Sequence, residues 1–127
     1  MILIVDDDEG LADTCSMYLE ANGFEVSVAA SGADALLRIH GTSPELVISD
    51  CAMPGMSGVE LSERLKADPL TAQMPILLMS ASLRCEVANS TSYDAFLRKP
   101  FLGENLLLEV RKLLDGVGPL HNNYCKV

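Results

Sequence analysis

The sequence lacks the features that mark several classes of protein. Its 127 residues include no Trp, only two His and few aromatic side chains. No apolar run approaches the roughly 20 residues that a membrane-spanning helix needs. The opening MILIV is followed at once by acids, whereas a secretory signal has a basic start and a longer apolar stretch. We therefore expect a soluble, cytoplasmic protein that does not associate with membranes.

Positive charge is also scarce. Nine Lys and Arg residues stand against eighteen Asp and Glu residues, which gives a net charge of −9. Proteins that bind nucleic acid through its phosphates are normally basic, so this balance disfavours nucleic acid and anionic membranes as partners. Part of the negative charge is concentrated in residues 6–9, which read DDDE. We expect no direct binding to nucleic acid, and we expect a local role for these acids.

The cysteines form no recognisable site. The four Cys residues are spaced neither as zinc ligands nor as a CxxC redox pair. Cys15 lies on the apolar face of a predicted helix, where it is expected to be a small core residue. Cys51 follows an Asp in a turn-rich stretch and is expected to be partly exposed. We expect no disulfide bond.

The chain alternates between short apolar runs and segments of helical periodicity. Apolar runs bounded by turn residues are typical of buried strands in a parallel sheet. They occupy residues 1–5, 24–28, 46–48, 76–79 and 93–97. The alternation predicts a doubly wound α/β fold, with a five-stranded parallel sheet and helices on both faces. We expect one domain over residues 1–115, followed over residues 116–127 by a tail or linker stub without periodicity.

Three helical segments carry more specific expectations. Ser31 should cap a helix whose inward stripe is Ala33, Leu36, Leu37 and His40. The last helix should turn its own stripe inward, which consists of Leu102, Leu106, Val110, Leu113 and Leu114. Residues 82–92 show the weakest helical pattern, because the run Asn-Ser-Thr-Ser within them favours turns. The helix between the fourth and fifth strands is therefore expected to be short or irregular.

Polar residues follow four of the five predicted strands. They are Asp6 and Asp7, Asp50, Ser80 and Lys99. The carboxyl ends of parallel strands share one edge of the sheet, so these groups should lie together. Carboxylates about 4 Å apart repel by about 4 kcal/mol at an effective dielectric constant near 20, so the cluster should hold a proton or a cation.

The chemistry of this cluster suits phosphoryl transfer. Mg²⁺ prefers hard oxygen ligands and is commonly held by one or two carboxylates together with phosphate oxygens. Lys99 would supply a second positive contact to a phosphoryl group and Ser80 a hydrogen bond. Asp50 would be the nucleophile and would form an acyl phosphate.

Four motifs occur in an order that matches a known family. They are VDDDE after the first strand, SDCAMPGMSG around Asp50, MSA after the fourth strand, and KPF at Lys99. Together they resemble the receiver domain of two-component response regulators, over residues 1 to about 115. The resemblance implies a flavodoxin-like sheet with strand order 2-1-3-4-5. It also implies a signalling switch of a phosphorelay rather than an enzyme.

The resemblance implies a role for each residue at the cluster. Asp50 is the phosphoacceptor, and the donor is a phosphohistidine on a sensor histidine kinase or histidine phosphotransfer protein. Asp7, Asp50 and the backbone carbonyl of Ala52 are implied to bind Mg²⁺, with Mn²⁺ as an alternative. Asp6 is implied to hold a metal-bound water. Lys99 is implied to pair with the phosphate.

The resemblance also implies a switch and a fixed turn. Ser80 contacts the phosphoryl oxygen, and Phe96 takes the place of the aromatic residue that moves inward with it. The Lys99–Pro100 peptide bond is expected to be cis. A phosphorylation-dependent homodimer is a further expectation.

Two departures from the family pattern bear on function. The segment between Ser80 and Lys99 is a few residues shorter than usual, which puts output through the customary surface in question. Ala52 and Ser82 stand where the family tunes hydrolysis of the acyl phosphate, and neither can orient an attacking water as an amide or acid would. We therefore expect a long-lived phosphoaspartate.

Two other functions are open at this point. A small phosphatase of the haloacid dehalogenase type would use Asp6 as nucleophile and Asp8 as acid, which have the required alternate spacing. Against it, Glu9-Gly10 replaces the expected Gly-Thr, and the chain is short. The other alternative is a receiver-like scaffold that binds partners without phosphorylation, which the complete set of acids, hydroxyl and lysine disfavours.

Overall fold

The fold is a parallel sheet covered by helices on both faces. The computed structural model describes residues 1–81 and 93–115. The strands are β1 (Ile2–Val5), β2 (Val26–Ala29), β3 (Leu46–Asp50), β4 (Ile76–Ser80) and β5 (Ala95–Arg98). The helices are α1 (Glu9–Ala21), α2 (Gly32–Thr42), α3 (Gly58–Ala67) and α4 (Gly103–Asp115). All strand pairs are parallel, in the order β2-β1-β3-β4-β5, which confirms the predicted fold class.

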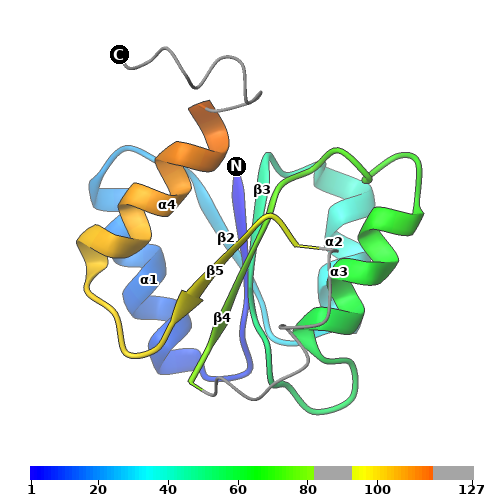
Figure 1. The fold of residues 1–127 in the computed structure, drawn as a ribbon, viewed down its shortest axis with the longest axis horizontal. Helices are drawn as coiled ribbons and strands as arrows, with labels where there is room; N and C mark the ends of the chain where they lie inside the picture. The colour runs from blue at the N-terminus through cyan, green and yellow to red at the C-terminus, as the bar shows by residue number, and fades with distance from the viewer. Residues whose placement is uncertain (82–92, 116–127) are drawn as a thin grey trace.

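The two faces of the sheet are covered by different helices. Figure 1 shows α1 and α4 on one side and α2 and α3 on the other. Leu3 and Val47 point into the core beneath α2 and α3, whereas Ile4 and Ile48 point into the core beneath α1 and α4. Successive side chains of a strand face opposite sides, so a sheet covered on both faces needs apolar residues at every position. This explains the continuous apolar runs, since each fully buried Leu or Ile stabilises the fold by about 1.5–3 kcal/mol.

Short polar side chains cap three helices. The side chains of Asp8, Ser31 and Ser57 accept hydrogen bonds from backbone N–H groups of the first turns of α1, α2 and α3. Such caps satisfy donors that have no partner within the helix, and each contributes about 1 kcal/mol. The cap at Asp8 fixes the residue at which α1 begins after the turn that follows β1. The cap at Ser57 does the same for α3 after the loop that follows β3.

Some predicted side-chain orientations are wrong. Helix α2 buries Ala35 and Ile39, and of the predicted stripe only Leu36 packs against the core, whereas Ala33, Leu37 (76% exposed) and His40 are exposed. Gly32 lies on the same buried face, and Met56 packs beside it, with its Sδ 2.9 Å from where a Cβ on Gly32 would be. Leu102 precedes α4 and is also exposed.

Cys15 is buried as predicted, but Cys51 is buried too, at 3% exposure, because it packs into the core beneath α2 and α3. Neither Cys15 nor Cys51 forms a disulfide bond within the described part of the chain. The predicted irregular helix within residues 82–92 lies outside the described residues. Among those that are described, no helix has the length and apolar character to cross a membrane.

Candidate functional site

The carboxyl edge of the sheet carries the predicted polar residues. Asp6 directly follows β1, Asp50 is the last residue of β3, and Lys99 directly follows β5. Backbone hydrogen bonds fix the position of these residues along the strand direction. The Asp6 N–H donates to Ala29 O at 3.1 Å. The Lys99 N–H likewise donates to Ser80 O at 2.9 Å. Hydrogen bonding of the strands thus continues one residue past the sheet and delivers these side chains to one place.

The side chains of this edge are in direct contact. Carboxylate oxygens of Asp6, Asp7 and Asp50 all lie within 4.8 Å of one another. The Lys99 Nζ donates to Asp50 Oδ1 at 2.9 Å and lies 3.7 Å from Asp6 Oδ2. Asp6 and Asp50 are buried and Asp7 is exposed, so the cluster is in contact with solvent at Asp7. Three acids and one lysine leave an uncompensated negative charge.

Asp6 is in an unfavourable environment for a carboxylate. Its Oδ1 accepts the Asp8 N–H at 2.9 Å, but its Oδ2 is buried and has no hydrogen-bond partner. Burial raises the pKa of Asp6; the Asp8 N–H and Lys99 oppose this rise, and the charges of Asp50 and Asp7 add to it. A buried oxygen without a donor, next to two more carboxylates, fits a hard divalent cation. The residues present therefore suit the Mg²⁺ that this kind of site takes.

Lys99 is held in its charged form. Burial lowers the pKa of Lys99, but the hydrogen bond and charge of Asp50, together with the charges of Asp6 and Asp8, outweigh that effect. The net result is a raised pKa, so Lys99 is a cation at neutral pH. Its ammonium group stands beside Asp50, where it would pair with any negative group added to that carboxylate.

A glycine fixes the backbone of Asp50, which the sequence analysis did not anticipate. A Cβ on Gly58 would lie 2.1 Å from the carbonyl oxygen of Asp50, and the Gly58 N–H donates to Cys51 O at 2.9 Å. The start of α3 therefore touches the end of β3. A Gly eight positions after the central acid, directly behind a helix cap, was the available signal.

The remaining predicted residues surround this cluster. Ser80 ends β4 and is buried, and Ala52 is exposed in the loop after Asp50. Phe96 is half-buried and packs against the core beneath α2 and α3. The Lys99–Pro100 peptide bond is cis. Within the described ranges the carboxylate group does not include Asp8, whose side chain caps α1.

Fold and cluster together define a family. The sequence model of the family described as the response regulator receiver domain matches residues 2–111 of this chain. The chain belongs to the response regulator receiver domains, the phosphorelay switches of two-component systems. The resemblance seen in the sequence is thereby confirmed, and nothing in these comparisons supports a phosphatase.

Individual relatives agree with this assignment. The chain is 35% identical over 123 residues to the phosphate regulon transcriptional regulatory protein PhoB of Rhizobium meliloti, covering 93% of this chain and 53% of PhoB. It is 32% identical to the DNA-binding response regulator MtrA of Mycobacterium tuberculosis, covering 89% of this chain and 50% of MtrA. The chain thus spans about half the length of these curated relatives.

Solved structures show the same fold over nearly their whole length. The receiver domain of a signal transduction histidine kinase from Syntrophus aciditrophicus superposes with a TM-score of 0.85 at 32% identity, covering 93% of this chain and 92% of that one. The response regulator TrrA from Thermotoga maritima, solved with Mg²⁺ and BeF, gives a TM-score of 0.81 at 30% identity, covering 89% and 97%.

Proposed function

We propose that Asp50 accepts a phosphoryl group from a phosphohistidine on a sensor histidine kinase or histidine phosphotransfer protein. The observation that carries this proposal is the contact of Asp50 with Lys99 at 2.9 Å beside two further carboxylates. A carboxylate oxygen of Asp50 attacks phosphorus, the bond from phosphorus to the imidazole nitrogen breaks, and its electron pair stays on the imidazole. Lys99 then pairs with the new phosphoryl oxygens.

The acidic cluster supplies the ligands for Mg²⁺. Asp7, Asp50 and the backbone carbonyl of Ala52 would bind the ion, and Asp6 would hold a water on it; Mn²⁺ is an alternative. When bound, the ion neutralises negative charge on the incoming phosphoryl group. Without a cation, the acids of this cluster repel an incoming phosphate. Positioning and electrostatics, rather than proton transfer, are then the contributions of the protein.

The switch is proposed to run through Ser80 and Phe96. Ser80 lies on β4 between the strands that carry Asp50 and Lys99, where its hydroxyl can reach a phosphoryl oxygen. Phe96 stands on β5 next to Leu78 of β4 in the strand register, so a shift at the end of β4 is transmitted to it. The outcome is a changed surface for a downstream partner, and the protein acts as a switch rather than a turnover enzyme.

The place and partners of the protein follow as proposals. We place the receiver in the cytoplasm. We expect no direct contact with membranes or nucleic acid, because its net charge of −9 repels these anionic partners. Phosphorylation is proposed to promote formation of a homodimer, which size-exclusion chromatography with light scattering would detect as a doubled mass after phosphorylation. A mass that stays monomeric would leave the signal to a different partner.

Phosphorylation with acetyl phosphate and Mg²⁺ tests the central proposal. Intact-mass analysis should show one added phosphoryl group, and borohydride trapping should locate it at Asp50. Asp50→Asn should abolish the label, whereas Asp13→Asn, an exposed acid on α1, should retain it. A label on Asp6 would support the phosphatase alternative, and failure to bind Mg²⁺ or to accept phosphate would support the scaffold.

A further inference from the structure

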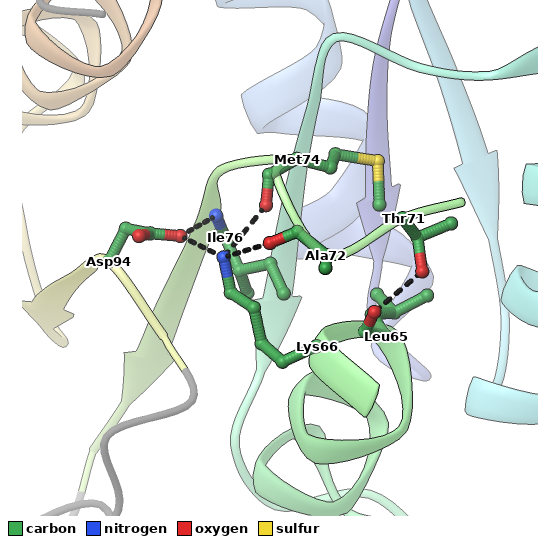
Figure 2. A network of polar contacts seen from close by, with 7 residues as sticks. All are labelled: Leu65, Lys66, Thr71, Ala72, Met74, Ile76 and Asp94. Atoms are coloured by element: carbon green, nitrogen blue, oxygen red, sulfur yellow. Dashed lines mark hydrogen bonds and ion pairs between the residues drawn. The ribbon is translucent and has the colours of Figure 1, made fainter. Parts of the chain in front are cut away.

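A polar network joins three segments at the opposite edge of the sheet from Asp50. The Lys66 Nζ, from the last turn of α3, donates to Ala72 O at 3.3 Å, to Met74 O at 3.1 Å and to Asp94 Oδ2 at 2.9 Å. Figure 2 shows the ammonium group between these acceptors. An ammonium has three N–H donors, so each has an acceptor here. Lys66 is therefore tied to the loop before β4 and to the residue before β5.

Asp94 connects this network to the sheet. Its N–H donates to Ile76 O at 2.8 Å, and its Oδ2 accepts the Ile76 N–H at 2.8 Å. The same oxygen accepts from Lys66. Asp94 directly precedes β5 and Ile76 is the first residue of β4, so these bonds set where β5 begins along β4. Charge-assisted bonds of this kind are about twice as strong as neutral ones.

β5 is less deeply buried than the central strands of the sheet. It is a four-residue strand at the edge of the sheet, and within residues 1–81 and 93–115 its pairing partner is β4. Its apolar residues are half-buried, whereas those of β1, β3 and β4 are fully buried. Burial of a strand face is what most strongly specifies the register of that strand, and in β5 this burial is only partial. A fixed polar contact at the start of β5 therefore matters more than it would in the central strands.

The register of β5 decides where Lys99 stands. A slip of one residue moves Lys99 by about 3.3 Å along the strand and turns it to the other face. Its contact with Asp50 is 2.9 Å and would not survive that displacement. We propose that Asp94, held by Lys66, is a positioning residue that places Lys99 beside Asp50 by fixing the register of β5. The inference rests on the proposed role of Lys99 in phosphorylation of Asp50.

A double-mutant cycle on the phosphorylation rate tests this. Asp94→Ala should slow labelling of Asp50 by acetyl phosphate about tenfold or more, since small displacements of a positioned group have such effects. In a Lys99→Ala background, Asp94→Ala should have no further effect. Asp34→Ala is the matched control: Asp34 has the same exposure within a point (38% against 39%) and a similar ion pair, but lies on α2. It should leave the rate unchanged.

Two further measurements keep the test decisive. Asp94→Asn keeps an acceptor for the Ile76 N–H and should recover part of the rate even if the Ala variant folds poorly. In the unphosphorylated protein, hydrogen exchange of the Lys99 amide should accelerate about tenfold in Asp94→Ala, while exchange of Ile4 in β1 changes far less.

Equal acceleration at Lys99 and Ile4, or an equal rate loss in both backgrounds, would mean that Asp94 only supports the fold and would overturn the proposal. A wild-type protein that takes no phosphate would refute the proposed function instead. The exchange measurement would still decide whether Asp94 places Lys99.

Discussion

At the scale of single residues, Asp6 is fully buried, and its Oδ2 accepts no hydrogen bond although it lies 3.7 Å from the Lys99 Nζ. An unsatisfied buried acceptor costs about 1–3 kcal/mol. We expect Asp6→Asn to raise the free energy of unfolding of the metal-free protein by about that amount at neutral pH, because it also removes one of the clustered charges. Urea unfolding in EDTA measures this. The same variant should lose stabilisation by Mg²⁺. A lower free energy of unfolding than the wild type in EDTA would contradict our account of Asp6.

The pKa of Asp6 gives this prediction a pH dependence. Its pKa in the folded state is raised above the ordinary value of 3.8, mainly by burial. The folded protein therefore keeps this proton at pH values where the unfolded chain has lost it, and stability contributed by Asp6 declines as pH rises from 3.8 through the raised pKa. Without metal, Asp6→Asn should reduce the fall in the free energy of unfolding that the wild type shows over this pH range. An unchanged slope would mean that other groups cause it.

Ala52 should govern how long the phosphoryl group lasts. Its exposed methyl group, next to Cys51 and Asp50, cannot orient a water for attack on phosphorus. We expect Ala52→Asn to shorten the lifetime of the phosphoaspartate. The lifetime is measured as the rate at which phosphoprotein disappears in Mg²⁺ after the phosphoryl donor is removed. A wild-type half-life of only seconds would contradict the prediction. Ser82, the second position of this kind, lies outside the described residues.

At the scale of elements, the contact between β3 and α3 depends on Gly58. A Cβ there would lie 2.1 Å from Asp50 O, so Gly58→Ala must displace either the helix or the strand end. Overpacking of this kind costs about 1–3 kcal/mol, and we expect it also to slow phosphorylation of Asp50 because the nucleophile moves. Urea unfolding and the acetyl phosphate rate measure the two effects.

Gly41→Ala provides the matched control for that variant. Apart from its chain neighbours and the backbone of its own helix, no atom of the described residues lies within 4 Å of where its Cβ would be, and the residue lies within α2. Ala is favoured over Gly in a helix by about 0.5–1 kcal/mol, so Gly41→Ala should leave stability unchanged or improved, with the phosphorylation rate unaffected. If both variants behaved alike, the close approach of Gly58 to Asp50 would not be the cause.

At the scale of the whole molecule, cation binding should be coupled to folding. The acidic cluster exists only when β1 and β3 are paired, so the unfolded chain offers no comparable site. A ligand at a hundred times its Kd stabilises the folded state by about 2.7 kcal/mol. We expect Mg²⁺ to raise the thermal midpoint, and Asp7→Asn to remove most of this effect.

Screening must be separated from specific binding, because the net charge is −9 and any salt reduces repulsion. NaCl at matched ionic strength is the control, together with Asp13→Asn, which removes an acid outside the cluster. A midpoint that rises equally in NaCl and in MgCl₂ would refute a dedicated cation site.

The sequence by itself determined the sheet and the membership of its carboxyl edge. Continuous apolar runs bounded by turn residues predicted strands covered on both faces, and parallel strands bring their ends to one side. For that reason Asp6, Asp50 and Lys99 were predictable as neighbours, although 49 positions separate the last two. Ser57 and Ser31 were predictable as caps because a cap acts on residues three positions away.

Only the tertiary structure decided how the elements turn and touch. Helix α2 turns Ala35 and Ile39 toward the core, so the inward stripe predicted from α2 alone was right for Leu36 and wrong for Ala33, Leu37 and His40. The burial of Cys51, the approach of Gly58 to Asp50 and the bond of Lys66 to Asp94 likewise depend on where other segments pack. Local patterns report the period of a helix or strand, whereas these contacts depend on distances between elements that no local pattern encodes.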